Sequence, residues 1–393
     1  MKKNLMCVIC LILSVLFVIN SNKSIDVQAF YNDDLFSSFT SDSYVLLDVE
    51  SGSVLVSKNS DQKMQVASIC KLMTSLIVME KIDHGIVGLN DLVVASDYAC
   101  SMEGSQAFLD SGSKYTVSDL LKSVIVASAN DSAVALAEHV CGSENLFVSE
   151  MNKRAKELGM DDTIYANATG LPAPNQHSTA FDTSIILKEV SKQELYLKFS
   201  NVWMDKFVHP SGRETELVNT NRLIKYYDKC KTGKTGFTDE AGYCLASMSD
   251  NNNLKLIAVT LKCDKAQDRF KESVELFNYG FANFQNRKII DSSVLLDQNI
   301  VVVGGTEVVA PVKFKNDFSV VVNKSDRSKC DVKIDLKKSI FAPASKNDVV
   351  GKATIVKDGK VLGEVDILIA EDIKKQNLKD IFNKISNNWL IFK

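Results

Sequence analysis

The chain has 393 residues, enough for two domains with a sizeable buried core. Its hydrophobic fraction of 45% and its charged fraction of 24% are those of an ordinary soluble protein. A formal net charge of -3 gives no reason to expect binding to nucleic acid.

The first 29 residues have the layout of a secretory signal peptide. Lys2 and Lys3 form a basic start, residues 5–19 are almost wholly apolar, and a small-x-small cleavage site ends at Ala29. An uncleaved membrane anchor is the alternative, but the apolar run is shorter than the roughly 20 residues that a spanning helix needs. We therefore expect cleavage before Phe30 and export of the remaining chain.

Neither the cysteines nor the histidines form a recognisable site. Seven of the nine cysteines follow the signal segment, and these seven contain no C-x-x-C pair and no Cys/His cluster with zinc spacing. A disulfide framework is typical of much smaller exported domains. We expect most of these thiols to be buried as small hydrophobes, and we expect neither a metal ion nor another cofactor.

The apolar spacing predicts a mixed α/β domain over residues 30–285. Two β runs flank Ser51-Gly52 and predict a hairpin. Helical spacing follows at residues 66–82, 117–126, 131–140 and 145–158. After residue 236 the pattern predicts strands at 243–246 and 254–261, and then a helix at about 268–284.

Residues 290–370 consist of short alternating or β-branched runs. Asp358-Gly359 stands between two of them, which is a strong hairpin signal. We expect a small all-β domain that contributes no catalytic residue.

Residues 371–393 predict an amphipathic helix with one apolar stripe. Lys375, Lys379 and Lys384 lie off the stripe. This segment is too charged to span a bilayer but fits a helix that lies in the membrane interface, where Trp389 suits the headgroup level. The alternative is a last helix packed on the β domain. The stripe follows helical spacing through Leu378, Ile381, Phe382, Ile385, Trp389 and Phe392.

A serine and a lysine share one face at the start of the first predicted helix. In Ser68-Ile69-Cys70-Lys71 the two side chains stand at positions i and i+3, so the lysine amine can reach the serine hydroxyl. A desolvated lysine near another cation has a lowered pKa and can accept the serine proton. By itself S-x-x-K occurs by chance in most proteins of this size.

Two further short motifs follow in the chain. Ser128-Ala129-Asn130 lies between two helical stretches, where serine and asparagine also serve as turn and cap residues. Lys-Thr-Gly occurs twice in a row, beginning at Lys231 and at Lys234, just before a predicted strand. Each motif alone is weak, but the order S-x-x-K, S-x-N, K-T-G is far more specific. No G-x-S-x-G occurs, which argues against the usual serine hydrolase elbow.

In this order and spacing the sequence resembles the penicillin-recognising serine acyltransferases. Within them it is similar to the exported D-alanyl-D-alanine carboxypeptidases, the low-molecular-mass penicillin-binding proteins of the serine peptidase S11 type. The blocks ASICKLMT, ASANDSAVALAEH, LGMDDTIYANATGL, STAFD and KTGFTDEAGYC carry the resemblance over roughly residues 40–285. It implies a penicillin-binding/β-lactamase-like transpeptidase fold, α/β (α+β) in class, with a small C-terminal all-β domain.

The resemblance also implies a function in cell wall biogenesis at the outer face of the cytoplasmic membrane. The enzyme would remove the terminal D-alanine of peptidoglycan pentapeptide stems through an acyl-enzyme on Ser68. β-Lactams would be covalent inhibitors at the same serine. Lys71 would accept the proton and Ser128 would relay it to the leaving amine.

The remaining site residues of the family would bind the substrate. Asn130 would hold the substrate amide, and Lys234 and Thr235 would face the terminal carboxylate. Gly236 completes the K-T-G motif. The second copy of that motif is the one followed by an aromatic residue, a threonine and A-G-Y, so Lys231 is interpreted as a coincidental repeat.

Two further residues have roles only through the resemblance. The Phe237 amide would join the Ser68 amide in an oxyanion hole. Arg269 matches a family arginine that meets the carboxylate, although a structural ion pair is an alternative for it.

Three other functions share parts of this signature. A β-lactamase of the common class carries a glutamate in the loop after S-x-N, but residues 159–171 contain only Asp161 and Asp162 as acids. A β-lactam sensor needs a transmembrane helix and a cytoplasmic partner domain, and neither is visible. An endopeptidase that cuts cross-links uses the same residues and stays open as an alternative.

Overall fold

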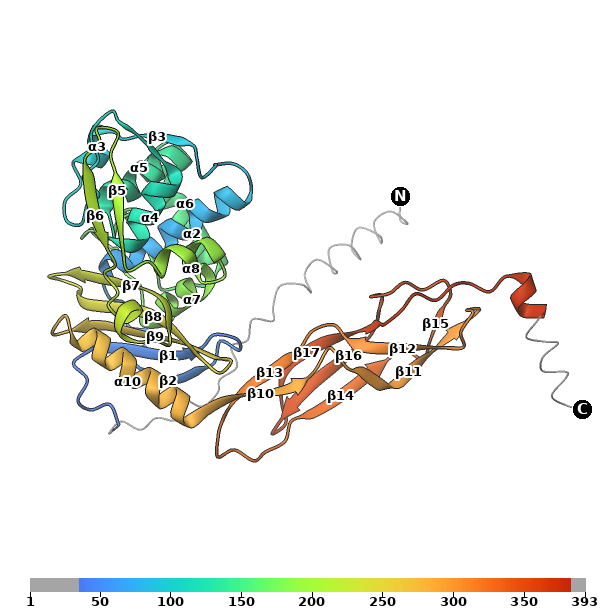
Figure 1. Ribbon diagram of the computed structural model, residues 1–393. Coiled ribbons are helices and arrows are strands. Elements are labelled where there is room, and N and C mark those ends of the chain that lie inside the picture. The colour runs from blue at the N-terminus through green and yellow to red at the C-terminus, as the bar shows by residue number, and fades with distance from the viewer. Residues whose placement is uncertain (1–34, 383–393) are drawn as a thin grey trace, which may run out of the picture. The chain divides into compact units, whose positions relative to one another are not determined.

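The computed structural model describes residues 35–382, which form two compact units (Figure 1). The division between the units falls between Ala282 and Asn283. The expected signal peptide, residues 1–29, and the end of the expected tail helix, residues 383–393, lie outside the described residues.

The first unit is built on a five-stranded antiparallel sheet with the order β2-β1-β9-β8-β7. The hairpin predicted around Ser51-Gly52 is confirmed as β1–β2. The two strands predicted after residue 236 are also confirmed, and both are longer than predicted. The strands are β1 (Ser43–Asp48), β2 (Val54–Lys58), β7 (Cys230–Thr238), β8 (Gly242–Asn251) and β9 (Leu254–Cys263).

Helices cover both faces of this sheet (Figure 1). The long helix α10 (Asp268–Asn283) lies along one face, where Gly280 brings it close to the sheet. A Cβ atom at Gly280 would lie 2.4 Å from Leu256 Cδ1 and 3.0 Å from Leu46 Cδ2. The other face packs against α7 (Ala180–Val190), which contacts β1, β8 and β9.

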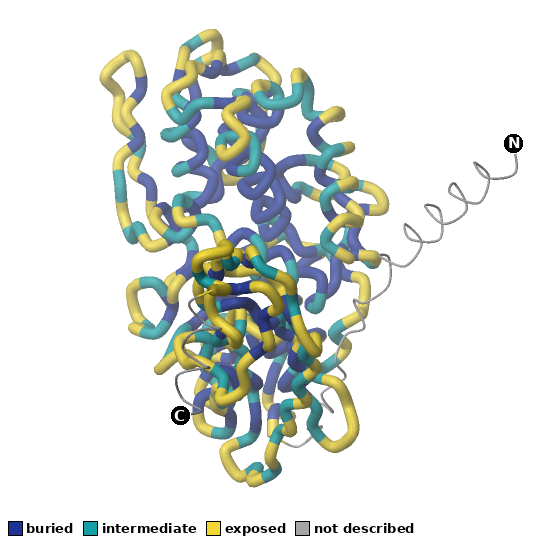
Figure 2. The backbone as a smooth tube through the Cα atoms, turned by 90° about the vertical axis from the view of Figure 1, so that its right-hand side faces the viewer, coloured by how far each residue is buried: buried dark blue, intermediate teal, exposed yellow. Residues whose placement is uncertain are grey.

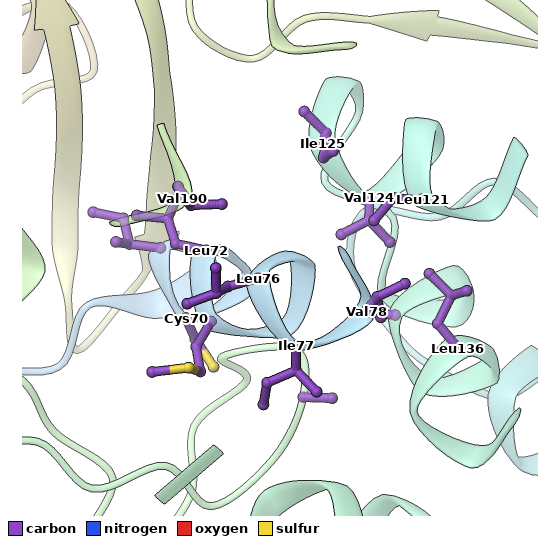
Figure 3. Packing of buried hydrophobic residues seen from close by; sticks show 14 of the residues in the cluster. Cys70, Leu72, Leu76, Ile77, Val78, Leu121, Val124, Ile125, Leu136 and Val190 are labelled. Carbon is purple, nitrogen blue, oxygen red and sulfur yellow. The ribbon is translucent and has the colours of Figure 1, made fainter. Parts of the chain in front are cut away.

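The helix α2 (Lys71–Asp83) is the centre of the helical layer. Its residues from Lys71 to Met79 are all buried, as the dark blue segments of Figure 2 illustrate. Figure 3 shows Leu72, Leu76 and Val78 of α2 packed among side chains of its neighbours. A helix that is buried on all sides over most of its length is stable only when other elements surround it.

The other helices of the first unit enclose α2 or connect to it. The predicted helices at 66–82, 117–126, 131–140 and 145–158 are confirmed within a few residues. The first of them is split, because the short 3-10 helix η1 (Ala67–Cys70) precedes α2. The others are α3 (Asp97–Cys100), α4 (Val117–Val126), α5 (Asn130–Cys141), α6 (Glu144–Glu157), α8 (Glu194–Ser200) and α9 (Leu223–Tyr226).

Two small antiparallel strand pairs complete the first unit. One pairs β3 (Leu92–Val94) with β4 (Lys114–Thr116), and the other pairs β5 (Met204–Val208) with β6 (Glu214–Val218). The buried imidazole of His209 follows β5, with its Nε2 2.9 Å from Thr215 Oγ1 of the partner strand. Burial lowers the pKa of His209, so the ring is neutral at physiological pH.

The second unit is all β, as the sequence predicts. Its strands form a six-stranded sheet, β14-β16-β17-β12-β11-β15, and a two-stranded sheet, β10-β13. Asp358 and Gly359 both have positive φ and close the predicted hairpin between β16 and β17. The strands are β10 (Phe284–Ile290), β11 (Leu295–Val303), β12 (Val309–Phe314), β13 (Phe318–Asn323), β14 (Asp331–Leu336), β15 (Ser339–Phe341), β16 (Val349–Lys357) and β17 (Lys360–Ile369).

The tail that follows β17 is not helical from residue 371. Ile373 is buried in the core of the second unit and exchanges backbone hydrogen bonds with Ala344, so this stretch is held as an extended strap. A helix begins only at residue 378 and continues to 382, the last described residue. Within residues 35–382 no helix is both long and apolar enough to cross a membrane.

A loop between α6 and α7 is wedged against η1 at a glycine. Gly170 has a φ of 82°, and a Cβ atom there would lie 2.0 Å from the Ala67 carbonyl oxygen. Cβ atoms essentially never approach other heavy atoms so closely. Gly159, earlier in the same connection, has a similar φ of 76° but open space around it.

These two glycines allow a matched test of the wedge. Gly159→Ala adds only the cost of a left-handed alanine, about 1 kcal/mol. Gly170→Ala adds the same cost and also forces the loop away from Ala67, so we expect a loss above about 3 kcal/mol in the free energy of unfolding. Urea unfolding of both variants measures the difference. Equal losses would show that the loop can move aside freely.

Candidate active site

Ser68 and Lys71 come together at the junction of η1 and α2. Lys71 Nζ donates a hydrogen bond to Ser68 Oγ at 3.0 Å and another to the Thr169 carbonyl oxygen at 2.6 Å. Lys71 is 1% exposed, whereas Ser68 is only partly buried. The serine hydroxyl is therefore accessible while its lysine partner is sealed beneath it.

Burial changes the protonation of Lys71. Loss of water around the amine lowers its pKa to about 7, although the thiol of Cys70 and the carboxylate of Asp131 act in the opposite direction. A substantial fraction of Lys71 is then neutral near pH 7, and a neutral amine can accept a proton from the serine.

Ser128 and Asn130 lie in the turn between α4 and α5. Ser128 has a φ of 65°, which is unusual for a residue with a Cβ atom, and it is buried. Asn130 begins α5, and its Nδ2 donates to the Glu103 carbonyl oxygen at 2.5 Å. Its Oδ1 is buried and has no hydrogen-bond partner within the described residues. That oxygen can accept a hydrogen bond from a bound molecule.

Lys234 of β7 connects the two serine motifs. Its Nζ donates to Ser128 Oγ at 2.8 Å and to the Thr235 carbonyl oxygen at 3.1 Å. The side chain is 1% exposed, and burial lowers its pKa well below the usual value. The charges of Lys71 and Arg269 lower that pKa further. Lys71 and Lys234 are therefore close enough for the charge of Lys71 to affect the pKa of Lys234.

The first Lys-Thr-Gly copy lies elsewhere. In the pairing of β7 with β8, Cys230 faces Ser249 and Thr232 faces Met248, so Lys231 is the extra residue of a β-bulge. Its side chain is exposed. The structure thus brings Lys234 to the serines and leaves Lys231 outside the group.

The next residues of β7 form the edge of the site. Thr235 Oγ1 donates to Thr220 Oγ1 at 2.7 Å. Gly236 lies directly against η1, since a Cβ atom there would be 2.3 Å from the Val66 carbonyl oxygen. Phe237 is 47% exposed and stacks on Tyr243, with ring centroids 4.3 Å apart. Only a glycine at position 236 lets β7 approach the serine so closely.

Arg269, at the start of α10, contacts the backbone of β7. Its Nη1 donates to the Gly236 carbonyl oxygen at 2.9 Å, and its guanidinium lies over the Tyr243 ring. In residues 35–382 its Nε is buried without a hydrogen-bond partner, and the charged groups around it include no carboxylate that could form the ion pair considered for it. Burial lowers the Arg269 pKa. The side chain adds positive charge to the K-T-G end of the site.

The site depends on residues that the motifs do not contain. The loop at 167–170 supplies the Thr169 carbonyl to Lys71, and Asn167 Oδ1 accepts the Gly170 amide at 2.7 Å. Cys70 is buried beside this loop and donates to the Asn167 carbonyl oxygen. Any residue type can supply a backbone carbonyl, so the motifs could not identify the Thr169 carbonyl. The one signal in the sequence was the glycine of Ala-Thr-Gly, which indicates an unusual backbone conformation.

Asp162 of the same connection and Asp182 of α7 have partners outside this arrangement. Asp162 forms an ion pair with Lys63 at 3.0 Å, and Asp182 accepts hydrogen bonds from Thr163 and from the Asp162 amide. Within residues 35–382 there is also no cluster of His, Cys, Asp and Glu that could hold a metal ion.

Known proteins share both units of this chain. The peptidase S11 family, described as D-alanyl-D-alanine carboxypeptidase, matches residues 30–265, and the C-terminal domain of penicillin-binding protein 5 matches residues 284–375. The carboxypeptidase DacF of Bacillus subtilis is 35% identical over 89% of this chain and 90% of its own length. DacA of Haemophilus influenzae is 31% identical over 90% and 89%, respectively.

A solved structure gives the same answer for the fold. Penicillin-binding protein 5 from Haemophilus influenzae superposes with a TM-score of 0.71 at 30% identity, over 86% of this chain and 98% of that one. The expected penicillin-binding fold with a C-terminal β domain is thereby confirmed. With the family match spanning more than half of the sequence, this chain belongs to the D-alanyl-D-alanine carboxypeptidase family.

Proposed function

We propose that Ser68 is the nucleophile with which this serine carboxypeptidase removes the terminal D-alanine of peptidoglycan stem peptides. One observation carries the proposal: an accessible serine hydroxyl lies 3.0 Å from a buried lysine amine whose pKa is lowered to about 7. A neutral amine at hydrogen-bond distance is the base that a serine nucleophile needs.

The acylation step follows from these contacts. Ser68 Oγ attacks the carbonyl carbon between the two D-alanines as its proton passes to Lys71 Nζ. The new oxyanion is held by the amides of Ser68 and Phe237, where the loss of one donor typically costs about 3 kcal/mol. The C–N bond then breaks, and the proton reaches the leaving amine through Ser128, which Lys234 orients. Water later hydrolyses the acyl-enzyme and restores Ser68.

The substrate is held by groups on both sides of Ser68. The Asn130 Oδ1, which lacks a partner in the described chain, accepts the amide of the stem peptide. Lys234, Thr235 and Arg269 make the other side cationic and polar, as the terminal carboxylate requires. Because β-lactams present a similar carboxylate and carbonyl, they acylate the same serine.

Two alternatives predict different products. A β-lactamase needs a group that activates water beside the acyl-enzyme. Of the two acids in residues 159–171, Asp161 is exposed and Asp162 is paired with Lys63. An endopeptidase acts on cross-linked peptides with the same residues. Free D-alanine is the product that identifies the carboxypeptidase.

Mass spectrometry of the intact protein tests the nucleophile. After incubation with penicillin, the wild type should gain one penicilloyl group that persists, and with a pentapeptide ending in D-Ala-D-Ala it should release D-alanine. Ser68→Ala should remain folded and show neither. Full labelling of that variant would contradict the assignment, and rapid release of hydrolysed penicillin would favour the β-lactamase.

The Lys71 pKa predicts a pH dependence of acylation. The reactive form carries neutral Lys71, so the second-order rate constant for penicillin acylation should rise with pH through about 7 and then level off. Stopped-flow acylation between pH about 5.5 and about 9 measures this profile, with circular dichroism as the control for folding. A rate that stays constant or falls with rising pH would exclude Lys71 as the base.

We also propose that the mature enzyme is exported and lies at the outer face of the membrane through its tail. The apolar residues Leu378 and Phe382 begin the predicted stripe and are 86% and 72% exposed. This exposure supports an apolar helix face that binds the membrane surface. The nascent wall, which carries the substrate, is made at that membrane face.

Truncation tests the tail. Removal of the residues after Gln376 keeps Ile373 in the core of the β unit, so the remaining protein should stay folded. It should no longer float with anionic liposomes but should keep its activity on a soluble pentapeptide. If truncated and full-length proteins partition alike, the tail is a packing element only.

A further inference from the structure

A second pocket lies in the first unit at the start of β7. It has a volume of about 590 Å³, within the range of small-molecule sites. Its walls come from the turn after β1, from α7 and α8, and from β7, β8 and β9. Lys231, the bulge residue of the first Lys-Thr-Gly copy, is among its lining residues.

The charges around this pocket are mostly positive. Four lysines line it, namely Lys188, Lys192, Lys231 and Lys255, against the two acids Glu50 and Asp250. Lys192 pairs with Glu189. The other three lysines make no ion pair within the described residues. Lys188 is partly buried with its amine beside Gly52; burial lowers its pKa, and the Asp48 carboxylate acts in the opposite direction.

The floor of the pocket is apolar. Met248 is buried, Leu197 and Val49 are partly buried, and all three line the cavity. A simple inorganic anion would not use such a floor. The combination fits an organic anion that carries carboxylates together with small apolar groups.

We propose that this pocket binds a second stem peptide of the same peptidoglycan, through its carboxylates and its alanine methyl groups. The proposal rests on the proposed function, because the substrate polymer repeats such peptides along each strand. Lys231 lies three residues before Lys234 on β7, about 10 Å along the strand. Engagement of a neighbouring stem would raise the effective concentration of the polymer at Ser68 without a change in the catalytic group.

The test uses full-length enzyme whose active site is blocked with penicillin, and the block is verified by mass before titration. If the proposed acylation of Ser68 does not occur, the mass measurement shows this before any peptide is added. The probe is the fluorescent tetrapeptide L-Ala-γ-D-Glu-(Nε-acetyl)-L-Lys-D-Ala, whose binding is followed by anisotropy. The blocked wild type should bind it, and a version with both carboxylates amidated should not bind.

Matched triple variants locate the binding. Lys188→Gln with Lys231→Gln and Lys255→Gln should weaken the tetrapeptide by about tenfold or more at low salt. Three exposed lysines without ion pairs in the described chain give the control, and their replacement should change the affinity by less than about twofold. The control set is Lys114→Gln, Lys156→Gln and Lys265→Gln.

The pocket triple should also keep its activity on a short pentapeptide, since none of its lysines touches the catalytic group. The proposal is overturned if the blocked enzyme does not bind the tetrapeptide, or if the two triple variants lose affinity equally. It is also overturned if the amidated peptide binds as well, or if an oligomer of glycerol phosphate binds far more tightly than the peptide.

Discussion

Lys71 and Lys234 place two amines in one buried site, where the loss of water lowers the pKa of both and the charge of Lys71 lowers the pKa of Lys234 further. Each amine lies 2.6–3.1 Å from a serine hydroxyl and a backbone carbonyl. Such neutral acceptors satisfy a lysine without restoring the pKa that a carboxylate would give it. The site therefore holds the pKa of Lys71 at about 7, which a surface lysine cannot achieve.

The backbone around the site adopts unusual conformations that place these carbonyls beside the amines. Ala67, which directly precedes Ser68, has a φ of 49°, and Ser128 itself has a φ of 65°. Gly170 and Gly236 lie so close to η1 that any side chain would collide with backbone oxygen atoms. Strain of this kind persists only where the surrounding packing is strong. The buried part of α2, Lys71–Met79, supplies that packing directly after the η1 turn that holds Ser68.

The sequence predicted the helices and the motif residues better than the connections between them. The helix at 117–126 has the predicted ends, because its apolar spacing and its Thr116 cap are both local signals. No element was predicted between residues 172 and 229, where α7, α8 and the β5–β6 hairpin occur. Those elements are defined by tertiary packing, as the burial of His209 beneath its hairpin illustrates.

The side chains of the site could be predicted from the sequence, but its backbone groups could not. Ser68, Lys71, Ser128 and Lys234 lie together in two hydrogen-bonded pairs, and family resemblance had selected them. The Thr169 carbonyl could not be found in the same way, since a carbonyl is common to every residue type. The tail began later than its periodicity indicated because the burial of Ile373 competes with helix formation.

The bulge in β7 has a consequence for how this strand tolerates changes in length. Side chains of a strand alternate between its faces, so one inserted residue normally turns every later side chain to the wrong face. Here the surplus residue is looped out between Cys230 and Thr232, and the pairing of Thr232–Thr238 with β8 is the same as in an uninterrupted ladder. The part of the strand that holds Lys234 is thereby insulated from the number of residues that precede it. A chain one residue shorter at this point could keep the pairing of Thr232–Thr238 with β8 and lose Lys231 from the neighbouring pocket.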